Sequence, residues 1–277
     1  MAQDYSPIGV FDSGYGGLTI LKELTRIEHS YDFVYLGDNA RTPYGSRSFE
    51  VVYHYTLEAV KFLFGLGCPL VILACNTASA KALRNIQQLD LPKIDPSRRV
   101  LGVIRPSVEK VAEITKNGRV GVLGTVGTIT SESYPVELAK WSGGKVVNTV
   151  QEACPMWVPI VENNEIDTPG ADYFIQKNIN NILKKDPDLD TLILGCTHYP
   201  LLIKSIRKFL PQGINIIEQG AVISEKLQDY LVRHAEIEKR ISRSNSIRYL
   251  TTESSAIFEE KAGFFLGKSV KAGHVQF

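Results

Sequence analysis

The sequence lacks an excess of charge of either sign. Its 31 lysines and arginines nearly cancel its 30 aspartates and glutamates, which leaves a formal net charge of +1. A protein that binds nucleic acid or an anionic membrane surface normally carries a basic excess. We therefore expect no nucleic-acid partner and no membrane partner.

Long apolar runs are also missing. No apolar stretch approaches the roughly 18 residues that a membrane-spanning helix needs. The N-terminal sequence MAQDYSPIGV has no basic region followed by an apolar one, as a secretory signal would. These absences predict a cytoplasmic protein.

Cysteines are few and widely spaced. The chain of 277 residues has four, at positions 68, 75, 154 and 196, and none forms a CxxC pair. This usage argues against a disulfide framework and a zinc ribbon, and it favours reduced thiols. Cys68 and Cys154 each precede a proline, and we expect them to be small buried residues, as free cysteines commonly are.

Short strand-type runs alternate with helix-type segments through most of the chain. This alternation predicts an α/β fold, with parallel sheets covered by helices, and the length allows one large unit or two domains of about 100 to 150 residues. The runs are PIGVF, DFVYL, LVILA, RVLGVI, RVGVLG, KVVNTV, TLILG and INIIE.

Two pairs of similar segments, here called the first and second echo, predict that the fold is duplicated. LVILACNTASA resembles TLILGCTHYPL, and IGVFDSGYGGLTIL resembles VGVLGTVGTITSES, at similar offsets along the chain. We expect two similar parallel-sheet α/β domains related by pseudo-twofold symmetry, with the active site in the cleft between them. The connections LDLPKIDPSRR and FLPQG suggest that residues 1–98 and 212–277 form the first domain and 99–211 the second.

The last part of the chain is less informative. EKLQDYLVRHAEIEKR is typical of one long amphipathic helix, and the segment from there to Phe277 carries no recognisable motif. Because that segment needs a partner to bury its apolar residues, we expect it to pack on the first domain.

The first echo places Cys75 and Cys196 at the carboxyl ends of strands. Ligands bind at this edge of α/β sheets, where helix N-termini favour anions and therefore a thiolate over a thiol. Two bases of one kind suit a reaction that removes a proton from one face of a substrate and returns it to the other, as in racemisation or epimerisation. His198, two residues after Cys196, is placed to stabilise a thiolate or share its proton.

Further candidates have plain structural alternatives. Asp12 and Ser13 precede a glycine-rich turn and suit a ligand, but either could cap a helix that starts near Leu18. Asp38 and the turn Pro43-Tyr44-Gly45 could be an ordinary loop. Thr125 and Thr128 could bind a carboxylate or cap a helix beginning near Thr130. Glu152 and Glu162 are equally plausible acids on the residues alone.

The chain resembles the glutamate racemases, members of the cofactor-independent amino-acid racemase superfamily. The resemblance rests on VFDSGYGGLTIL, YLGDNARTPYG, ACNTASA, GTVGTITSESY, ACPMWVPIVE and LGCTHYPLL, which occur in this order from residue 10 to 202. The stretches GVIRPS, with Arg105, and IIEQGAV, which lacks the usual Asp-Ser, depart from the family pattern.

The resemblance implies interconversion of L- and D-glutamate without pyridoxal phosphate or metal, to supply D-glutamate for peptidoglycan, in a homodimer. It assigns Cys75 and Cys196 as the catalytic thiols, assisted by Asp12 and His198, with Asp38 and Glu162 as further catalytic acids. The positions that match substrate-binding residues are Asp12, Ser13, Pro43, Tyr44, Gly45, Asn76, Thr77, Thr125, Thr128, Thr197 and His198.

Three other functions compete with this hypothesis. Aspartate racemase belongs to the same superfamily. A non-catalytic amino-acid binding protein would need the hydroxyls and helix ends but no pair of thiols. A thiol hydrolase that used Cys196 and His198 would have no use for Cys75.

Overall fold

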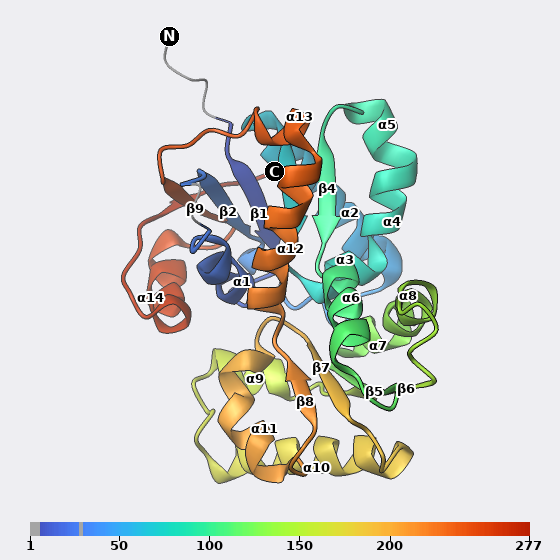
Figure 1. Ribbon diagram of the computed structural model, residues 1–277. Coiled ribbons are helices and arrows are strands. Elements are labelled where there is room, and N and C mark those ends of the chain that lie inside the picture. Colours follow the sequence, from blue (N-terminus) through green and yellow to red (C-terminus); the bar gives the residue numbers. More distant parts are fainter. Residues whose placement is uncertain (1–5, 28–29) are drawn as a thin grey trace. The chain divides into compact units, whose positions relative to one another are not determined.

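The computed structural model describes residues 6–27 and 30–277, which form two compact units (Figure 1). The first unit comprises the chain up to Val103 and again from Gly220, and the second comprises Ile104–Gln219. These boundaries lie a few residues after those expected at 98 and 211, because the strands Arg99–Gly102 and Asn215–Ile217 still pair within the sheets that precede them. Residues 1–5, which bear on the expected lack of a signal segment, lie outside the described part.

In the described part of the chain, the first unit contains a six-stranded sheet in the order β10-β9-β2-β1-β3-β4, whose strands pair in parallel. Its central strands β1, β2 and β3 are buried at every residue, as continuous apolar runs in a parallel sheet require. The strands are β1 (Ile8–Asp12), β2 (Phe33–Gly37), β3 (Leu70–Leu73), β4 (Arg99–Gly102), β9 (Ile247–Thr251) and β10 (Ala272–His274).

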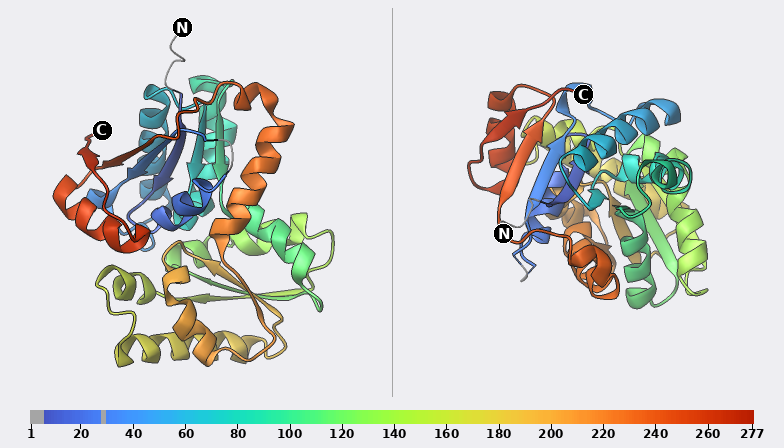
Figure 2. Two further views of the ribbon diagram at one scale, coloured as in Figure 1. Left: turned by 60° about the vertical axis from the view of Figure 1, so that its left-hand side comes forward. Right: turned by 90° about the horizontal axis from the view of Figure 1, so that it is seen from above.

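Helices cover both faces of this sheet (Figure 2). Phe11 and Leu73 belong to a buried cluster with residues of α2, whereas Tyr35 packs against Phe258 of α14 on the other face, with ring centroids 6.1 Å apart. The helical segments are α1 (Gly17–Leu24), η1 (Asn39–Arg41), α2 (Phe49–Gly65), α3 (Asn76–Lys81), α4 (Leu83–Asn85), η2 (Ile86–Asp90), α5 (Leu91–Ile94), α12 (Gln219–Arg233, mostly in this unit), α13 (Ala235–Glu238) and α14 (Ser255–Leu266).

The second unit contains a four-stranded parallel sheet in the order β6-β5-β7-β8. Its strands are β5 (Arg119–Gly124), β6 (Asn148–Ala153), β7 (Thr191–Gly195) and β8 (Asn215–Ile217). Its helical segments are α6 (Ile104–Ile114), α7 (Val126–Thr130), α8 (Ser133–Trp141), α9 (Trp157–Glu162), α10 (Pro169–Lys185), η3 (Tyr199–Leu202) and α11 (Ile203–Phe209).

The two sheets repeat one strand order. The order β2-β1-β3-β4 corresponds to β6-β5-β7-β8, so β3 and β7 occupy equivalent places. Phe11 aligns with Leu73 in the first sheet, and Leu123 aligns with Leu194 in the second. Cys75 and Cys196 each lie two residues beyond the aligned leucine. The echo seen in the sequence therefore corresponds to a repeated strand order in which the two thiols hold equivalent positions.

The segment after residue 240 packs on the first unit, as expected, and does so by adding strands β9 and β10 to the first sheet, where β9 pairs with β2. Two local features differ from the sequence-based expectations. The long helix expected over 225–240 is interrupted at His234, whose φ of −120° and ψ of 59° are not helical. The helix expected near Thr130 begins instead at Val126.

Within the described residues, no helix is both long and apolar enough to cross a membrane. In the same part of the chain, no three or more His, Cys, Asp or Glu side chains are grouped so that they could hold a metal ion.

Candidate functional site

Cys75 follows β3 and caps the N-terminus of α3, as expected from the strand-end pattern. Its Sγ accepts a hydrogen bond from the backbone N–H of Ala78 at 3.5 Å and lies 3.4 Å from the Oγ of Ser13. The residue is 6% exposed. A helix N-terminal N–H aimed at the sulfur stabilises negative charge on it, so this position suits a thiolate.

Asp12 ends β1, the strand next to β3. Its Oδ2 accepts a hydrogen bond from the backbone N–H of Gly14 at 2.9 Å, and the residue is 1% exposed. The helix that follows is capped by Gly16 and has no side-chain cap. The alternative role of Asp12 or Ser13 as the cap of α1 is therefore not observed.

Asp38 follows β2 and is fully buried. The hydroxyl of Tyr44 donates to its Oδ2, the Nε of Arg41 donates to the same oxygen at 2.7 Å, and the hydroxyl of Thr252 donates to Oδ1 at 2.8 Å. Both carboxylate oxygens are thus occupied by protein donors, which anchor the turn that carries Tyr44.

Tyr44 belongs to the same buried cluster as Cys75, the first thiol. Burial, the Asp38 carboxylate and the Cys75 sulfur together raise the pKa of Tyr44 far above its ordinary value, so its hydroxyl stays protonated. Its neighbours in the turn, Pro43 and Gly45, are exposed and partly exposed, and the peptide bond before Pro43 is cis.

Cys196 follows β7 and is also 6% exposed. The Nδ1 of His198 lies 3.8 Å from its Sγ, and the Nε2 of His198 lies 3.0 Å from the Oε1 of Glu162. Burial alone lowers the pKa of His198, but the hydrogen bonds to Cys196 and Glu162 outweigh it and raise the pKa to about 10. The imidazole is therefore positively charged at neutral pH.

The two glutamates that the residues alone left open differ in their surroundings. Glu152 accepts hydrogen bonds from Asn178 and Asn181 and forms an ion pair with Lys185 at 2.8 Å. Glu162 instead forms the contact with His198, at the C-terminal end of α9.

The remaining predicted polar residues lie beside the strand ends. Thr125 caps α7 by accepting from the N–H of Thr128 at 3.2 Å, and the two hydroxyls are 3.1 Å apart. Capping is therefore observed for Thr125, whereas Thr128 lies inside the helix. The residues Asn76, Thr77 and Thr197, which directly follow the two cysteines, are all buried.

Cys68 and Cys154 are buried, as predicted. Burial raises the pKa of Cys68 to about 12 and also raises that of Cys154 well above its usual value. Such thiols are unreactive at neutral pH. Of the four cysteines, only Cys75 and Cys196 occupy the equivalent strand-end positions.

Sequence reasoning missed two residues that hold Asp38. Arg41 lies in the stretch GDNARTPYG, three residues after Asp38, so its contact with Asp38 could be expected from the local sequence. Thr252 lies 214 residues further along the chain, and nothing in its local sequence indicates the contact.

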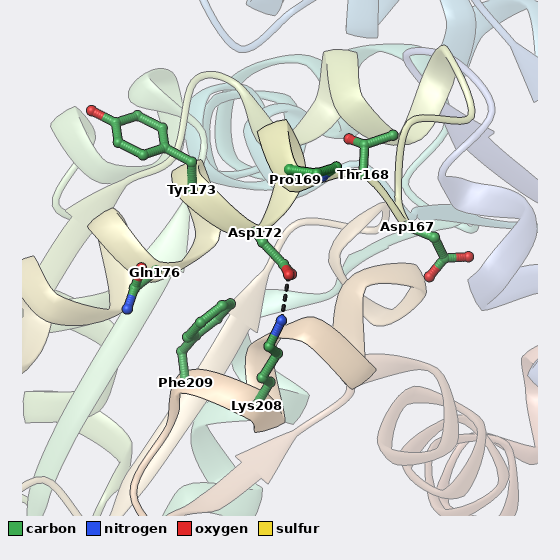
Figure 3. Close-up of a pocket in the computed structure, with 8 residues that line it drawn as sticks. All are labelled: Asp167, Thr168, Pro169, Asp172, Tyr173, Gln176, Lys208 and Phe209. Carbon is green, nitrogen blue, oxygen red and sulfur yellow. Dashed lines mark hydrogen bonds and ion pairs between the residues drawn. The ribbon is translucent and has the colours of Figure 1, made fainter.

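A separate hollow lies between α10 and α11 in the second unit (Figure 3). Asp172 and Lys208 form an ion pair at 2.5 Å across it, and the exposed Tyr173 lines its edge. None of the predicted site residues lines this hollow. It is therefore not the candidate site.

Comparison with known proteins gives a consistent result. Residues 20–254 match the Asp/Glu/Hydantoin racemase family. Over 264 residues the chain is 38% identical to the glutamate racemase of Persephonella marina, with 95% of this chain and 94% of that protein covered. It is 36% identical over 274 residues to the glutamate racemase of Streptococcus gordonii, with 98% and 99% covered.

Solved structures agree with the sequence relatives. Glutamate racemase isoform RacE1 from Bacillus anthracis is similar with a TM-score of 0.88 and 34% identity, over 99% of this chain and 98% of that one. The glutamate racemase of Francisella tularensis in complex with D-glutamate has a TM-score of 0.86 and 30% identity, over 99% and 98% of the chains. The chain therefore belongs to the Asp/Glu/Hydantoin racemase family, and within it to the glutamate racemases.

Proposed function

We propose that this protein interconverts L-glutamate and D-glutamate, with Cys75 and Cys196 as the two catalytic bases. The observation that carries the proposal is the equivalence of the two thiols. Cys75 follows β3 and Cys196 follows β7, which hold equivalent places in the two sheets. Each thiol also has a polar neighbour, Ser13 beside Cys75 and His198 beside Cys196. A binding protein or a hydrolase with one nucleophile would have no use for the second thiol.

The reaction needs one sulfur on each side of the substrate Cα. One thiolate takes the Cα proton, and the electron pair left on carbon delocalises into the α-carboxylate. The opposite thiol then gives its proton to the other face of the carbon. At the end the first sulfur carries a proton and the second does not, so the enzyme is prepared for the reverse direction and resets by exchanging a proton.

The thiols alone do not account for the whole acceleration. The Cα proton is a far weaker acid than a thiol, and a positioned base typically contributes about 10²- to 10⁴-fold. The remainder comes from fixed donors around the α-carboxylate, from close placement of each sulfur and from exclusion of water.

The ionisable groups near the two thiols have different roles in the reaction. The charged imidazole of His198, held by Glu162, stabilises the Cys196 thiolate. The negative charge of Asp12 disfavours a thiolate at Cys75, so Asp12 serves as a proton acceptor from that thiol or as a partner of the substrate ammonium. Asp38 acts indirectly, because its oxygens hold Tyr44 and the turn around it.

The substrate is held by hydroxyl, amide and backbone groups at the strand ends. Hydroxyl and backbone N–H donors suit the two carboxylates of glutamate. The proposed binding residues are Asp12, Ser13, Pro43, Tyr44, Gly45, Asn76, Thr77, Thr125, Thr128, Thr197 and His198.

The reaction implies a cellular role, which is to supply D-glutamate for peptidoglycan. The proposal further places the enzyme in the cytoplasm, as a homodimer that works without an added cofactor. It has no nucleic-acid or membrane partner.

One experiment tests this function directly. The purified protein is incubated in deuterated water with L-glutamate or L-aspartate, without cofactor, while optical rotation and the Cα proton signal are followed. We expect both to decay with glutamate. Faster decay with aspartate would favour an aspartate racemase, and tight binding without exchange would favour a binding protein.

Two variants test the bases. Cys75→Ala and Cys196→Ala are each expected to abolish racemisation in both directions, because each direction uses both sulfurs. Full turnover by either variant would exclude the two-thiol scheme. Cys68→Ala is the matched control, since that thiol is buried, and it is expected to keep turnover.

A further inference from the structure

Gln219 is a buried residue of the second unit that uses both hydrogens of its side-chain amide. Its Nε2 donates to the Oγ of Ser107 at 2.8 Å and to the hydroxyl of Tyr134 at 2.9 Å. The residue is 2% exposed and lies at the start of α12, where the chain leaves this unit. Ser107 lies in α6, shortly after the chain enters it.

The ring of Tyr134 lies against the end of the strand that carries the second thiol. Tyr134 is fully buried in α8, and a Cβ added to Gly195 would lie 3.2 Å from its Cε2. The same Cβ would lie 2.9 Å from the carbonyl oxygen of Leu123, so the strand end is enclosed on both sides. Gly195 directly precedes Cys196, and this packing fixes the backbone from which the thiol projects.

The thiol and the phenol also interact electrostatically. Burial raises the pKa of Tyr134, and negative charge on Cys196 raises it further, whereas hydrogen bonds from Ser107 and Gln219 act in the opposite direction. Tyr134 therefore bonds to Gln219 through its hydroxyl, while its ring packs against Gly195, the residue before Cys196.

We propose that Gln219 is a positioning residue for Cys196, acting through Tyr134. The proposal rests on the proposed function, because it assigns a role to the site in which Cys196 is a base. Without the Gln219 amide, the hydroxyl of Tyr134 keeps Ser107 but loses one of the two hydrogen-bond partners named above, and the buried network rearranges so that the ring shifts. Such a shift moves the end of β7, and small displacements of a catalytic group lower the rate without abolishing binding.

The test compares two variants with a matched control. Gln219→Met keeps the length of the side chain and removes both donors, and Tyr134→Phe keeps the ring and removes the hydroxyl. Gln87→Met is the control, since the amide of Gln87 donates at 2.7 Å to the carbonyl of Val100 in the other unit. The measurements are kcat, KM, the melting temperature and the rates at which iodoacetamide alkylates Cys196 and Cys75 in the same molecule.

We expect Gln219→Met and Tyr134→Phe to lower kcat roughly 10- to 100-fold with little change in KM. We also expect the ratio of Cys196 to Cys75 alkylation to change severalfold in both, and to stay at the wild-type value in Gln87→Met. A folded Gln219→Met with the wild-type ratio and kcat overturns the proposal. If that variant does not fold, the same result in Tyr134→Phe overturns it.

The alkylation ratio separates this proposal from the proposed function. If Cys196→Ala kept full turnover, the two-thiol reaction would be wrong, whereas the ratio would still report whether Gln219 positions the sulfur.

Discussion

The Nδ1 of His198 lies 3.8 Å from the Sγ of Cys196. Because the other ring nitrogen faces Glu162 at 3.0 Å, the imidazole is held between a sulfur and a carboxylate. Its raised pKa of about 10 means that a full positive charge stands beside the sulfur throughout the neutral range. This charge favours the thiolate that the reaction needs.

In the first prediction, the variant His198→Asn removes that charge. We expect alkylation of Cys196 at neutral pH to slow, because the sulfur has lost its neighbouring cation. We expect kcat/KM to fall by about 10²- to 10⁴-fold. Mass spectrometry of the alkylated peptides gives both thiols at once, and Cys75 serves as the internal control. Unchanged alkylation rates for both thiols would contradict the assignment.

The second prediction concerns the carboxylate behind the imidazole. Glu162→Gln removes an interaction that favours the charged ring, so the pKa of His198 falls and activity declines at a lower pH than in the wild type. The measurement is the alkaline limb of the kcat/KM profile. Glu165→Gln is the matched control, because Glu165 is exposed three residues further on, and its profile is expected to match the wild type. Equal profiles for both variants would remove Glu162 from the mechanism.

Local sequence predicted the parts of the fold that depend on local patterns. Each of the eight expected runs overlaps a strand. Strands β1, β2, β3 and β7 are buried at every residue, as continuous apolar runs in a parallel sheet are, and the two strand-end cysteines follow β3 and β7. Strand β6 is only partly buried and starts three residues after the expected run KVVNTV begins. Strands β9 and β10 were missed, because their sequences carry no such run. The place of β9 beside β2 depends on pairing over more than 200 residues of chain, and β10 pairs only with β9 in the described part of the chain.

The same limit applies to the site. The strand-end pattern indicated Asp38 as a site residue. It did not indicate that Thr252, from a distant segment, donates to the Oδ1 of Asp38. This contact favours a role of Asp38 as an anchor over a role as a reacting acid. The contact of Gln219 with Tyr134 is likewise long-range, since the partners are 85 positions apart in the chain. Side-chain partners brought together by the fold leave no mark on local sequence.

The third prediction tests the anchoring role of Asp38. In Asp38→Asn, the guanidinium of Arg41 loses a buried charged partner at 2.7 Å, and one of the donors to the former carboxylate is left unsatisfied. We expect the free energy of unfolding in urea to fall by about 1 to 3 kcal/mol. A variant with wild-type stability and no activity would show that Asp38 reacts directly rather than holding Tyr44.

The fourth prediction concerns Asp32, which ties β2 to the loop before β9. Its Oδ1 accepts hydrogen bonds from the N–H and hydroxyl groups of Ser244 and Ser246, at 2.7 to 3.0 Å. Burial would raise the pKa of Asp32, but these bonds and one from Ser242 outweigh it and hold the pKa well below its usual range.

The direction in which the unfolding free energy changes with pH follows from the linkage between proton binding and folding. A depressed pKa in the folded state stabilises the protein above the unfolded pKa of about 3.9, and this stabilisation is lost as the pH falls below it. The difference in unfolding free energy between wild type and Asp32→Asn should therefore be about 1 to 3 kcal/mol at pH 7 and shrink in acid. Chemical denaturation at several pH values measures it, and a constant difference would contradict the linkage.

The last prediction compares substitutions at two glycines. The comparison distinguishes an effect on the position of Asp12 from an effect on the stability of the fold. Gly17 begins α1 beside Asp12, and a Cβ there would lie 2.5 Å from the Cβ and 2.9 Å from the Cγ of Asp12. Since these distances are too short, Gly17→Ala must displace the carboxylate, and we expect kcat to fall about 10- to 100-fold. Overpacking is expected to cost about 1 to 3 kcal/mol of stability.

Gly65 supplies the matched control for that change. It ends α2, and a Cβ added there would have no atom within 4 Å, so Gly65→Ala should gain about 0.5 to 1 kcal/mol and keep wild-type kcat. Because both changes add one methyl group to a helix, a fall in kcat that appears only in Gly17→Ala reports the position of Asp12. Wild-type kcat in a folded Gly17→Ala would mean that Asp12 has no part in proton transfer.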